Sequence, residues 1–125
     1  MTPVAVLGAG SWGTTLANLL ARKGEVVRLW AYEPEVVEAI NTRHENSLFL
    51  PDVVLSPELR AFADPVEAVA GASVIVSVPP SHAARQVVRR VADAVAPGTL
   101  VVSATKGIET DTLALMSQVF AECLP

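Results

Sequence analysis

Short apolar runs alternate with longer amphipathic stretches along almost the whole chain. The apolar runs are rich in Val, which is typical of buried strands, and the amphipathic stretches repeat with the period of a helix. These patterns predict strands over residues 4–7, 26–31, 59–63, 74–78 and 100–104. They predict helices over residues 11–23, 34–40, 65–70, 81–95 and 111–123. A polar connection that contains proline, over residues 41–57, interrupts the alternation.

Alternating strands and helices form parallel sheets, because a right-handed crossover helix returns the chain to the same end of the sheet. Continuous apolar runs also indicate strands that are buried on both faces. We therefore predict an α/β fold with a doubly wound parallel sheet in the order 3-2-1-4-5, forming one domain over residues 1–125. The usual sheet of this kind adds a sixth strand, so the end of the sequence at Pro125 suggests truncation.

Composition narrows the class of protein. Hydrophobic residues make up 51% of the chain and charged residues 18%, which fits a sheet buried on both faces. The net charge is −4 and no basic cluster occurs, so we expect no nucleic-acid partner. Glycines and polar residues interrupt the uncharged N-terminal segment, so we expect neither a signal peptide nor a membrane span. The single cysteine, Cys123, excludes an internal disulfide and suits the cytoplasm.

The segment VLGAGSWGTTLA joins the first predicted strand to the first predicted helix. Gly8, Gly10 and Gly13 match the pattern G-x-G-x-x-G. The first glycine permits a tight turn, the second lets a pyrophosphate approach the backbone, and the third lets the helix pack closely on the strand. The start of the helix supplies free N–H groups to the phosphates. The segment therefore predicts a dinucleotide site of the Rossmann type.

The second strand should end at the group that binds the adenosine ribose. Glu33 follows Gly13 by twenty residues, where an acidic residue accepts hydrogen bonds from the ribose hydroxyls of NAD. No cation stands at positions 31–33 to hold the extra phosphate of NADP, so we predict NAD as the cofactor, with NADP as the alternative. Tyr32 is placed to stack on the adenine. A second reading of Glu33, compatible with the first, is a favourable charge at the start of the next helix.

Two later strand ends should reach the same cleft, because ligands of open α/β sheets bind outside the carboxyl ends of the strands. After the fourth strand, Pro79 and Pro80 stiffen the turn, and we place Pro80 at the cofactor. After the fifth strand, the segment SATKG carries Lys106, whose ammonium can hold a phosphate or polarise a carbonyl. The other reading of Lys106 is a solvated loop cation.

Four segments together resemble the NAD(P)-dependent glycerol-3-phosphate dehydrogenases. GAGSWGTTLA, NTRHENSLFLP, VPPSHA and SATKGIE occur in the order and spacing of that family. The glycine loop is common to many dehydrogenases, whereas the F-L-P and A-T-K-G segments are more specific. The resemblance covers nearly the whole chain. It implies an enzyme of glycerophospholipid metabolism that interconverts dihydroxyacetone phosphate and sn-glycerol 3-phosphate.

The resemblance also implies roles for single residues. Ser11 and Trp12 look like cofactor contacts, and Lys106 looks like the family's lysine that touches both substrate and cofactor, which makes it the catalytic candidate. Tyr32 and Ala84 depart from the family, in which many bacterial members carry Arg or His at the first position and several carry an aromatic at the second. The family's second, helical domain holds its main catalytic lysine, so we expect this chain alone to be inactive and the full-length enzyme to be a homodimer.

Two histidines and two asparagines have weaker claims to function. Neither histidine belongs to a metal-spaced cluster, and we expect no metal; His44 reads as a solvated loop residue and His82 as a polar residue lining the cleft. Asn41 and Asn46 are as readily explained by hydrogen bonds that hold their loop.

Two other functions of the protein stay open. One is a different two-domain enzyme, such as a 3-hydroxyacyl-CoA or 6-phosphogluconate dehydrogenase, and the other is a free-standing dinucleotide-sensing module.

Overall fold

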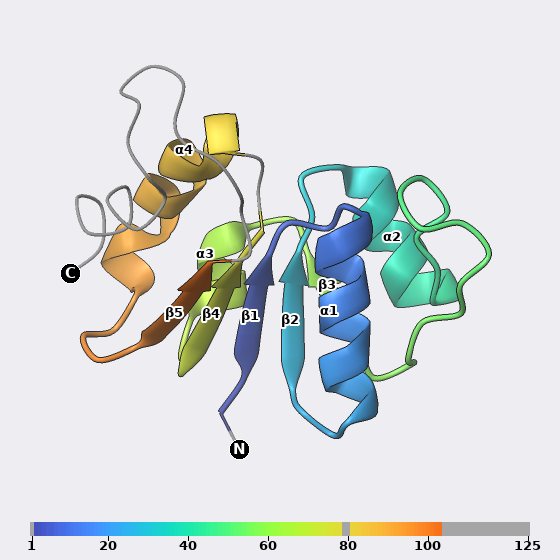
Figure 1. The fold of residues 1–125 in the computed structure, drawn as a ribbon, viewed down its shortest axis with the longest axis horizontal. Coiled ribbons are helices and arrows are strands. Elements are labelled where there is room, and N and C mark those ends of the chain that lie inside the picture. Colours follow the sequence, from blue (N-terminus) through green and yellow to red (C-terminus); the bar gives the residue numbers. More distant parts are fainter. Residues whose placement is uncertain (1, 79–80, 104–125) are drawn as a thin grey trace.

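The computed structural model describes residues 2–78 and 81–103. In this part of the chain, strands and helices alternate from end to end (Figure 1). The strands are β1 (Val4–Leu7), β2 (Val27–Trp30), β3 (Arg60–Phe62), β4 (Val74–Ser77) and β5 (Leu100–Ser103). The helices are α1 (Ser11–Arg22), α2 (Pro34–Arg43), α3 (Pro65–Val69), α4 (Ser81–Val91) and the short 3₁₀ helix η1 (Ala92–Ala94).

Strand β1 lies in the middle of a parallel sheet. It pairs with β2 on one side and with β4 on the other, and the full order is β3-β2-β1-β4-β5. This result confirms the predicted doubly wound fold and its strand order. The register aligns Leu7 with Trp30 and Ser77, and Ser77 with Ser103. The carboxyl ends of these four strands therefore meet at one edge of the sheet, where the sequence places the glycine loop.

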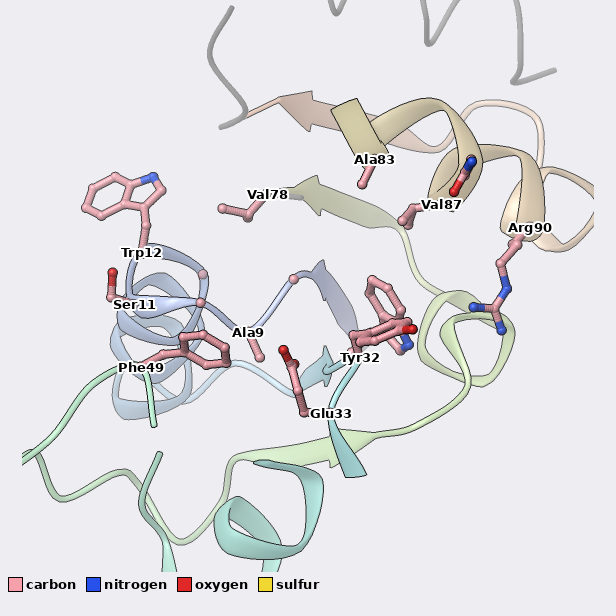
Figure 2. Close-up of a pocket in the computed structure, with 15 residues that line it drawn as sticks. Ala9, Ser11, Trp12, Tyr32, Glu33, Phe49, Val78, Ala83, Val87 and Arg90 are labelled. Atoms are coloured by element: carbon pink, nitrogen blue, oxygen red, sulfur yellow. The ribbon is translucent and has the colours of Figure 1, made fainter. Parts of the chain in front are cut away.

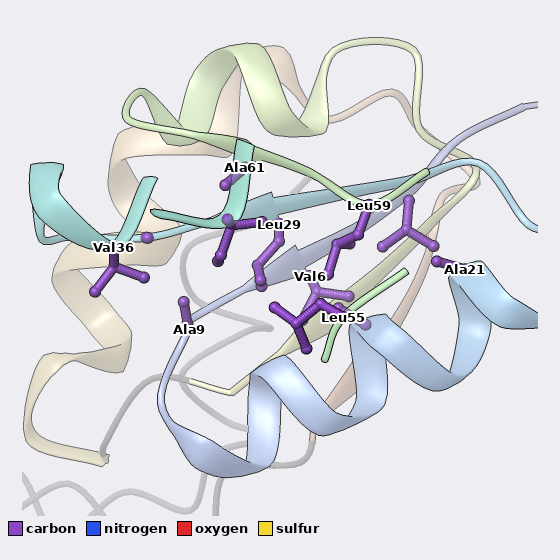
Figure 3. Close-up of a cluster of buried hydrophobic side chains, with 12 residues drawn as sticks. Val6, Ala9, Ala21, Leu29, Val36, Leu55, Leu59 and Ala61 are labelled. Atoms are coloured by element: carbon purple, nitrogen blue, oxygen red, sulfur yellow. The ribbon is translucent and has the colours of Figure 1, made fainter. Parts of the chain in front are cut away.

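Two apolar layers cover the two faces of the sheet. Along β1, Val6 belongs to the layer under α1 and α2, whereas Ala5 and Leu7 belong to the layer under α3 and α4. This division follows from the alternation of side chains along a strand. Figure 3 shows the first layer, in which Leu29 and Leu59 lie between the strands and helix α1. The apolar composition of the chain is thus used to bury the sheet on both sides.

Local sequence signals set the ends of two helices. Asp64 accepts a hydrogen bond from the backbone N–H of Val66 at 2.9 Å, and Pro65 takes the first helical position, so α3 begins at the predicted cap and proline. Helix α2 runs to Arg43, beyond its predicted end, and stops at His44, whose φ of 55° is left-handed. His44 lies just outside the helix, in a bend, and is half-buried.

The segment after α4 differs from the single long helix predicted over residues 81–95. Helix α4 stops at Val91, and η1 carries the chain toward the turn at Pro97 and Gly98. A tightened 3₁₀ turn at a helix end is common where the chain is about to reverse. The last predicted helix, over residues 111–123, lies outside the described residues. None of the described helices combines the length and hydropathy needed to cross a membrane.

Candidate dinucleotide site

A cavity of about 710 Å³ opens at the carboxyl end of β1 (Figure 2). Its walls come from the glycine loop, the chain that follows β2, the loop after α2, the end of β4 and one face of α4. The lining residues are Gly8, Ala9, Gly10, Ser11, Trp12, Gly13, Trp30, Tyr32, Glu33, Phe49, Val78, Ala83, Gln86, Val87 and Arg90. The cavity thus lies where open α/β sheets bind their ligands.

The three glycines of the loop have the geometry that their spacing predicts. Gly8 has a φ of 121°, in the region that favours glycine. A Cβ on Gly13 would lie 1.9 Å from the carbonyl oxygen of Gly8, so only glycine lets α1 approach the strand end this closely. A Cβ on Gly10 would meet no atom within 4 Å. The space beside Gly10 is therefore open at the point where a phosphate would approach the backbone.

Helix α1 begins beside this open space. Its N-cap, Gly10, has no side chain to bond the first turn, and that turn carries no acidic residue. Within the described part of the chain, no side chain bonds the first backbone N–H groups of the helix, and the helix dipole favours an anion in front of them. Ser11 lies on the lining, and Trp12 beside it is 56% exposed. This arrangement fits the pyrophosphate of a dinucleotide.

The chain after β2 lines the next part of the cavity. Glu33 is the N-cap residue of α2, but its side chain makes no capping hydrogen bond. Figure 2 shows the Glu33 carboxylate extending toward Ala9 of the glycine loop, which leaves it accessible to a ribose. Tyr32 is 78% exposed and lies on the same lining. Trp30, the last residue of β2, also lines the cavity, and its Nε1 donates to the carbonyl of Ala63 at 3.0 Å, which holds the indole in the wall.

A buried asparagine connects the loop after α2 to the glycine loop. Asn46 is 1% exposed, and its Nδ2 donates to the carbonyl of Ala9 at 2.9 Å and to Thr14 Oγ1 at 2.8 Å. Thr14 Oγ1 itself donates to the Ala9 carbonyl at 3.1 Å. Asn46 Oδ1 accepts from the N–H of Phe49 at 3.4 Å, and Phe49 lines the cavity. The bonds of Asn46 therefore reach well beyond its own loop, further than its sequence context indicated.

Asn41 has a structural role at the edge of the sheet. Its Nδ2 donates to the carbonyl of Ala61 at 3.0 Å, and its Oδ1 accepts from the N–H of Ala61 at 2.8 Å. Strand β3 pairs with β2 on one side. The Asn41 amide bonds both backbone groups of Ala61 and so takes the place of a further strand at that position.

The cavity brings together the residues that the sequence predicted at the glycine loop and after the second strand: Gly8, Gly10, Ser11, Trp12, Gly13, Tyr32 and Glu33. Two other predicted site residues, Pro80 and Lys106, lie outside the described residues, as do the side chains of His82 and Ala84. Across the described residues there is no group of three or more His, Cys, Asp or Glu side chains that could hold a metal ion.

Sequence reasoning missed two lining residues that carry distinctive chemistry. Phe49 belongs to the F-L-P segment but was not predicted as a site residue; the available signal was that it is the one aromatic residue in the connection over residues 41–57. Arg90 belongs to the Arg89–Arg90 pair, which the helical pattern alone assigns to the solvated side of the helix. Its spacing from Ala83 and Val87 places it on the helix face that borders the cavity, and only the position of α4 on the sheet reveals this.

Comparisons with known proteins agree on one group. A family model described as the N-terminus of NAD-dependent glycerol-3-phosphate dehydrogenase matches residues 3–125. A glycerol-3-phosphate dehydrogenase (NAD(P)+) from Geobacter sulfurreducens is 52% identical over 122 residues, which are 98% of this chain and 36% of the relative. The chain thus spans about 36% of the length of the curated relatives it matches.

Solved structures lead to the same group. Glycerol-3-phosphate dehydrogenase from Coxiella burnetii superposes with a TM-score of 0.90 at 37% identity, over 98% of this chain and 38% of that one. The enzyme of the same name from Saccharomyces cerevisiae superposes with a TM-score of 0.88 at 30% identity, over 98% of this chain and 39% of that one. The fold and the sequence therefore point to the same relatives.

Proposed function

Because the chain belongs to the NAD-dependent glycerol-3-phosphate dehydrogenase family and matches its N-terminus, we propose that residues 1–125 are the dinucleotide-binding domain of such an enzyme. The enzyme would interconvert dihydroxyacetone phosphate and sn-glycerol 3-phosphate by hydride transfer with NAD or NADP. The observation that carries this proposal is that one and the same cavity is lined by the glycine loop, Glu33 and Tyr32.

The described residues fit a dinucleotide in extended form. The open space at Gly10 and the uncapped start of α1 would receive the pyrophosphate. The carboxylate of Glu33 would accept from the ribose hydroxyls, and Tyr32 would cover the adenine. When bound, the cofactor supplies or accepts the hydride. The protein residues named here orient it and do not take part in the transfer.

Lys106 is the catalytic residue of the proposal within this chain. It follows Ser103, the last residue of β5, by three positions, and the carboxyl end of β5 lies at the edge of the sheet that carries the cavity. An ammonium there would stabilise the substrate oxygen that gains charge during hydride transfer, or would hold the substrate phosphate. Pro80 follows β4 at the same edge, and we place it against the cofactor.

The remaining parts of the proposal concern the whole enzyme. We infer that a second, helical domain supplies most of the substrate phosphate site and a further catalytic lysine, so the present chain binds the cofactor and does not turn over substrate alone. We also propose that the full-length enzyme is a cytoplasmic homodimer. The family assignment supports the presence of a second domain, because the chain matches only the N-terminus of the family. The single cysteine of the chain suits the cytoplasm.

The test compares binding and turnover in the purified full-length protein. Calorimetry measures NADH binding, and loss of NADH absorbance with dihydroxyacetone phosphate measures turnover; unphosphorylated dihydroxyacetone is the control substrate. The variant Gly10→Ala places a methyl group in the space left for the phosphate, while the free protein has room for it. We expect its unfolding temperature to stay unchanged and its NADH affinity to fall.

Three results would contradict the proposal. Binding of NADH without turnover of dihydroxyacetone phosphate would support the dinucleotide-sensing module instead. Full NADH affinity in Gly10→Ala, with the fold intact, would remove the glycine loop from the site. Turnover of a hydroxyacyl or sugar-acid substrate in place of dihydroxyacetone phosphate would assign a different dehydrogenase activity to the same cofactor domain.

A further inference from the structure

One charged residue of the cavity has no role in the function proposed above. Among the described lining residues, Arg90 is the only cation and Glu33 is the only carboxylate. Arg90 stands in the last turn of α4, where a cation is favoured by the helix dipole. Its neighbour Arg89 is also an exposed cation in the last turn and interacts equally well with the helix dipole, yet Arg89 does not line the cavity. The helix dipole therefore does not explain why Arg90, and not Arg89, lines the cavity.

Arg90 differs from most other described arginines in its contacts. Four of them donate hydrogen bonds to nearby oxygens: Arg22 to Val54, Arg28 to Glu67 and Ala70, Arg43 to Glu45, and Arg60 to Pro57. Across residues 2–78 and 81–103, no hydrogen bond or ion pair joins Arg90 to another residue. As far as residues 2–78 and 81–103 are concerned, its guanidinium is thus available to a ligand without the loss of a contact.

The lining residues of α4 form one face of the helix. They are Ala83, Gln86, Val87 and Arg90; their spacings of three and four residues place them along that face. Val87 is buried against the sheet, which fixes how the helix is rotated. Tyr32 reaches the cavity from a different element, the chain after β2. In Figure 2, Tyr32 and Arg90 both lie toward the end of the cavity that is far from Trp12.

The order of groups along the cavity indicates what would occupy that end. With the pyrophosphate at the glycine loop and the adenosine ribose at Glu33, the next part of the dinucleotide is the adenine. We propose that the Arg90 guanidinium lies flat on the adenine ring and forms, with Tyr32, the two sides of the adenine site. This inference rests on the proposed function and adds a specificity residue to it. A planar guanidinium stacks on an aromatic face, which the compact ammonium of lysine cannot do.

The competing ligand group for Arg90 is the 2′-phosphate of NADP. Two observations favour the adenine. Glu33 lines the same cavity and would repel a phosphate attached to the ribose that it binds. Trp30 and Val87 line the same cavity and are apolar, and Gln86, the polar lining residue of α4 nearest to Arg90 in sequence, is uncharged; this lining suits a flat aromatic ring better than a dianion.

The experiment measures affinity by calorimetry in the purified full-length protein with four ligands: NADH, NADPH, AMP and reduced nicotinamide mononucleotide. The variants are Arg90→Ala and Arg90→Lys, with Arg89→Ala as the matched control from the same turn of α4. We expect Arg90→Ala to weaken NADH, NADPH and AMP alike, by about three- to tenfold. Nicotinamide mononucleotide, which lacks the adenine, should bind unchanged. Arg90→Lys should recover little of the loss, and Arg89→Ala should match the wild type.

Other outcomes would overturn the inference. If Arg90→Ala weakens NADPH alone and Arg90→Lys restores it, Arg90 binds the 2′-phosphate. If Arg90→Ala and Arg89→Ala both bind all four ligands as the wild type does, Arg90 is a solvated cation and the proposed function stands without it. If the wild type binds neither NADH nor AMP, the cavity is not a dinucleotide site, and the proposed function fails together with the inference.

Discussion

Replacing Asn46 by alanine should loosen the glycine loop without removing any residue that touches the cofactor. The variant loses the bonds from Asn46 Nδ2 to the Ala9 carbonyl and to Thr14 Oγ1, at 2.9 and 2.8 Å, and the weaker bond from the Phe49 N–H at 3.4 Å. The Ala9 carbonyl keeps one partner, because Thr14 Oγ1 still donates to it. The Phe49 N–H loses the Asn46 oxygen.

The expected loss of stability follows from the hydrogen bonds that Asn46→Ala removes. Each lost bond is worth about 1 kcal/mol, and a buried group left without a partner costs about 1–3 kcal/mol. We therefore expect Asn46→Ala to lower the free energy of unfolding by about 2–4 kcal/mol. Because the Ala9 carbonyl orients the loop between Gly8 and Gly10, we also expect NADH to bind about tenfold more weakly, which is about 1.4 kcal/mol.

The matched control is Asn41→Ala. It also loses two side-chain bonds, to the carbonyl and N–H of Ala61, but at the edge of β3 and away from the cavity lining. Unfolding is followed in denaturant without cofactor, because bound NADH would itself raise stability. Both variants should be destabilised, whereas only Asn46→Ala should lose affinity. If the two variants lose similar stability and both keep wild-type NADH affinity, Asn46 is a purely structural residue and our reasoning about the loop is wrong.

Three further predictions concern the cofactor, the substrate and the sheet edge. NADH should bind more tightly than NADPH, because the carboxylate of Glu33 would repel a 2′-phosphate, and calorimetry showing the reverse order would contradict this. In the full-length enzyme, Lys106→Ala should lower kcat/KM by about 10²–10³-fold while the melting temperature barely moves; near-normal turnover would make Lys106 a solvated cation. The 125-residue chain should sediment as dimers or larger species, because β5 pairs with β4 alone among the described strands and exposes Leu100 and Val102; a cooperative monomer would refute this.

The sequence by itself determined the features that depend on near neighbours. The apolar runs predicted all five strands within one or two residues, and their alternation with helices predicted the strand order. The roles of Gly8, Gly10 and Gly13 could be assigned because each concerns the backbone within a single strand–turn–helix unit. Asp64 and Pro65 started α3 for the same reason, since a helix cap acts over two or three residues.

Only the tertiary structure decided which distant side chains meet. Asn46 bonds to Ala9 and Thr14, 37 and 32 residues away, and a lone amide in a polar loop carries no periodic signal of such partners. Arg90 shows the same limit. The sequence pattern predicted the helix that carries it, but which exposed residues of α4 face the cavity depends on the rotation of the helix, which the burial of Val87 fixes. Periodicity records the spacing along one element, whereas a binding site is assembled between elements, and their relative positions are set by packing of the whole sheet.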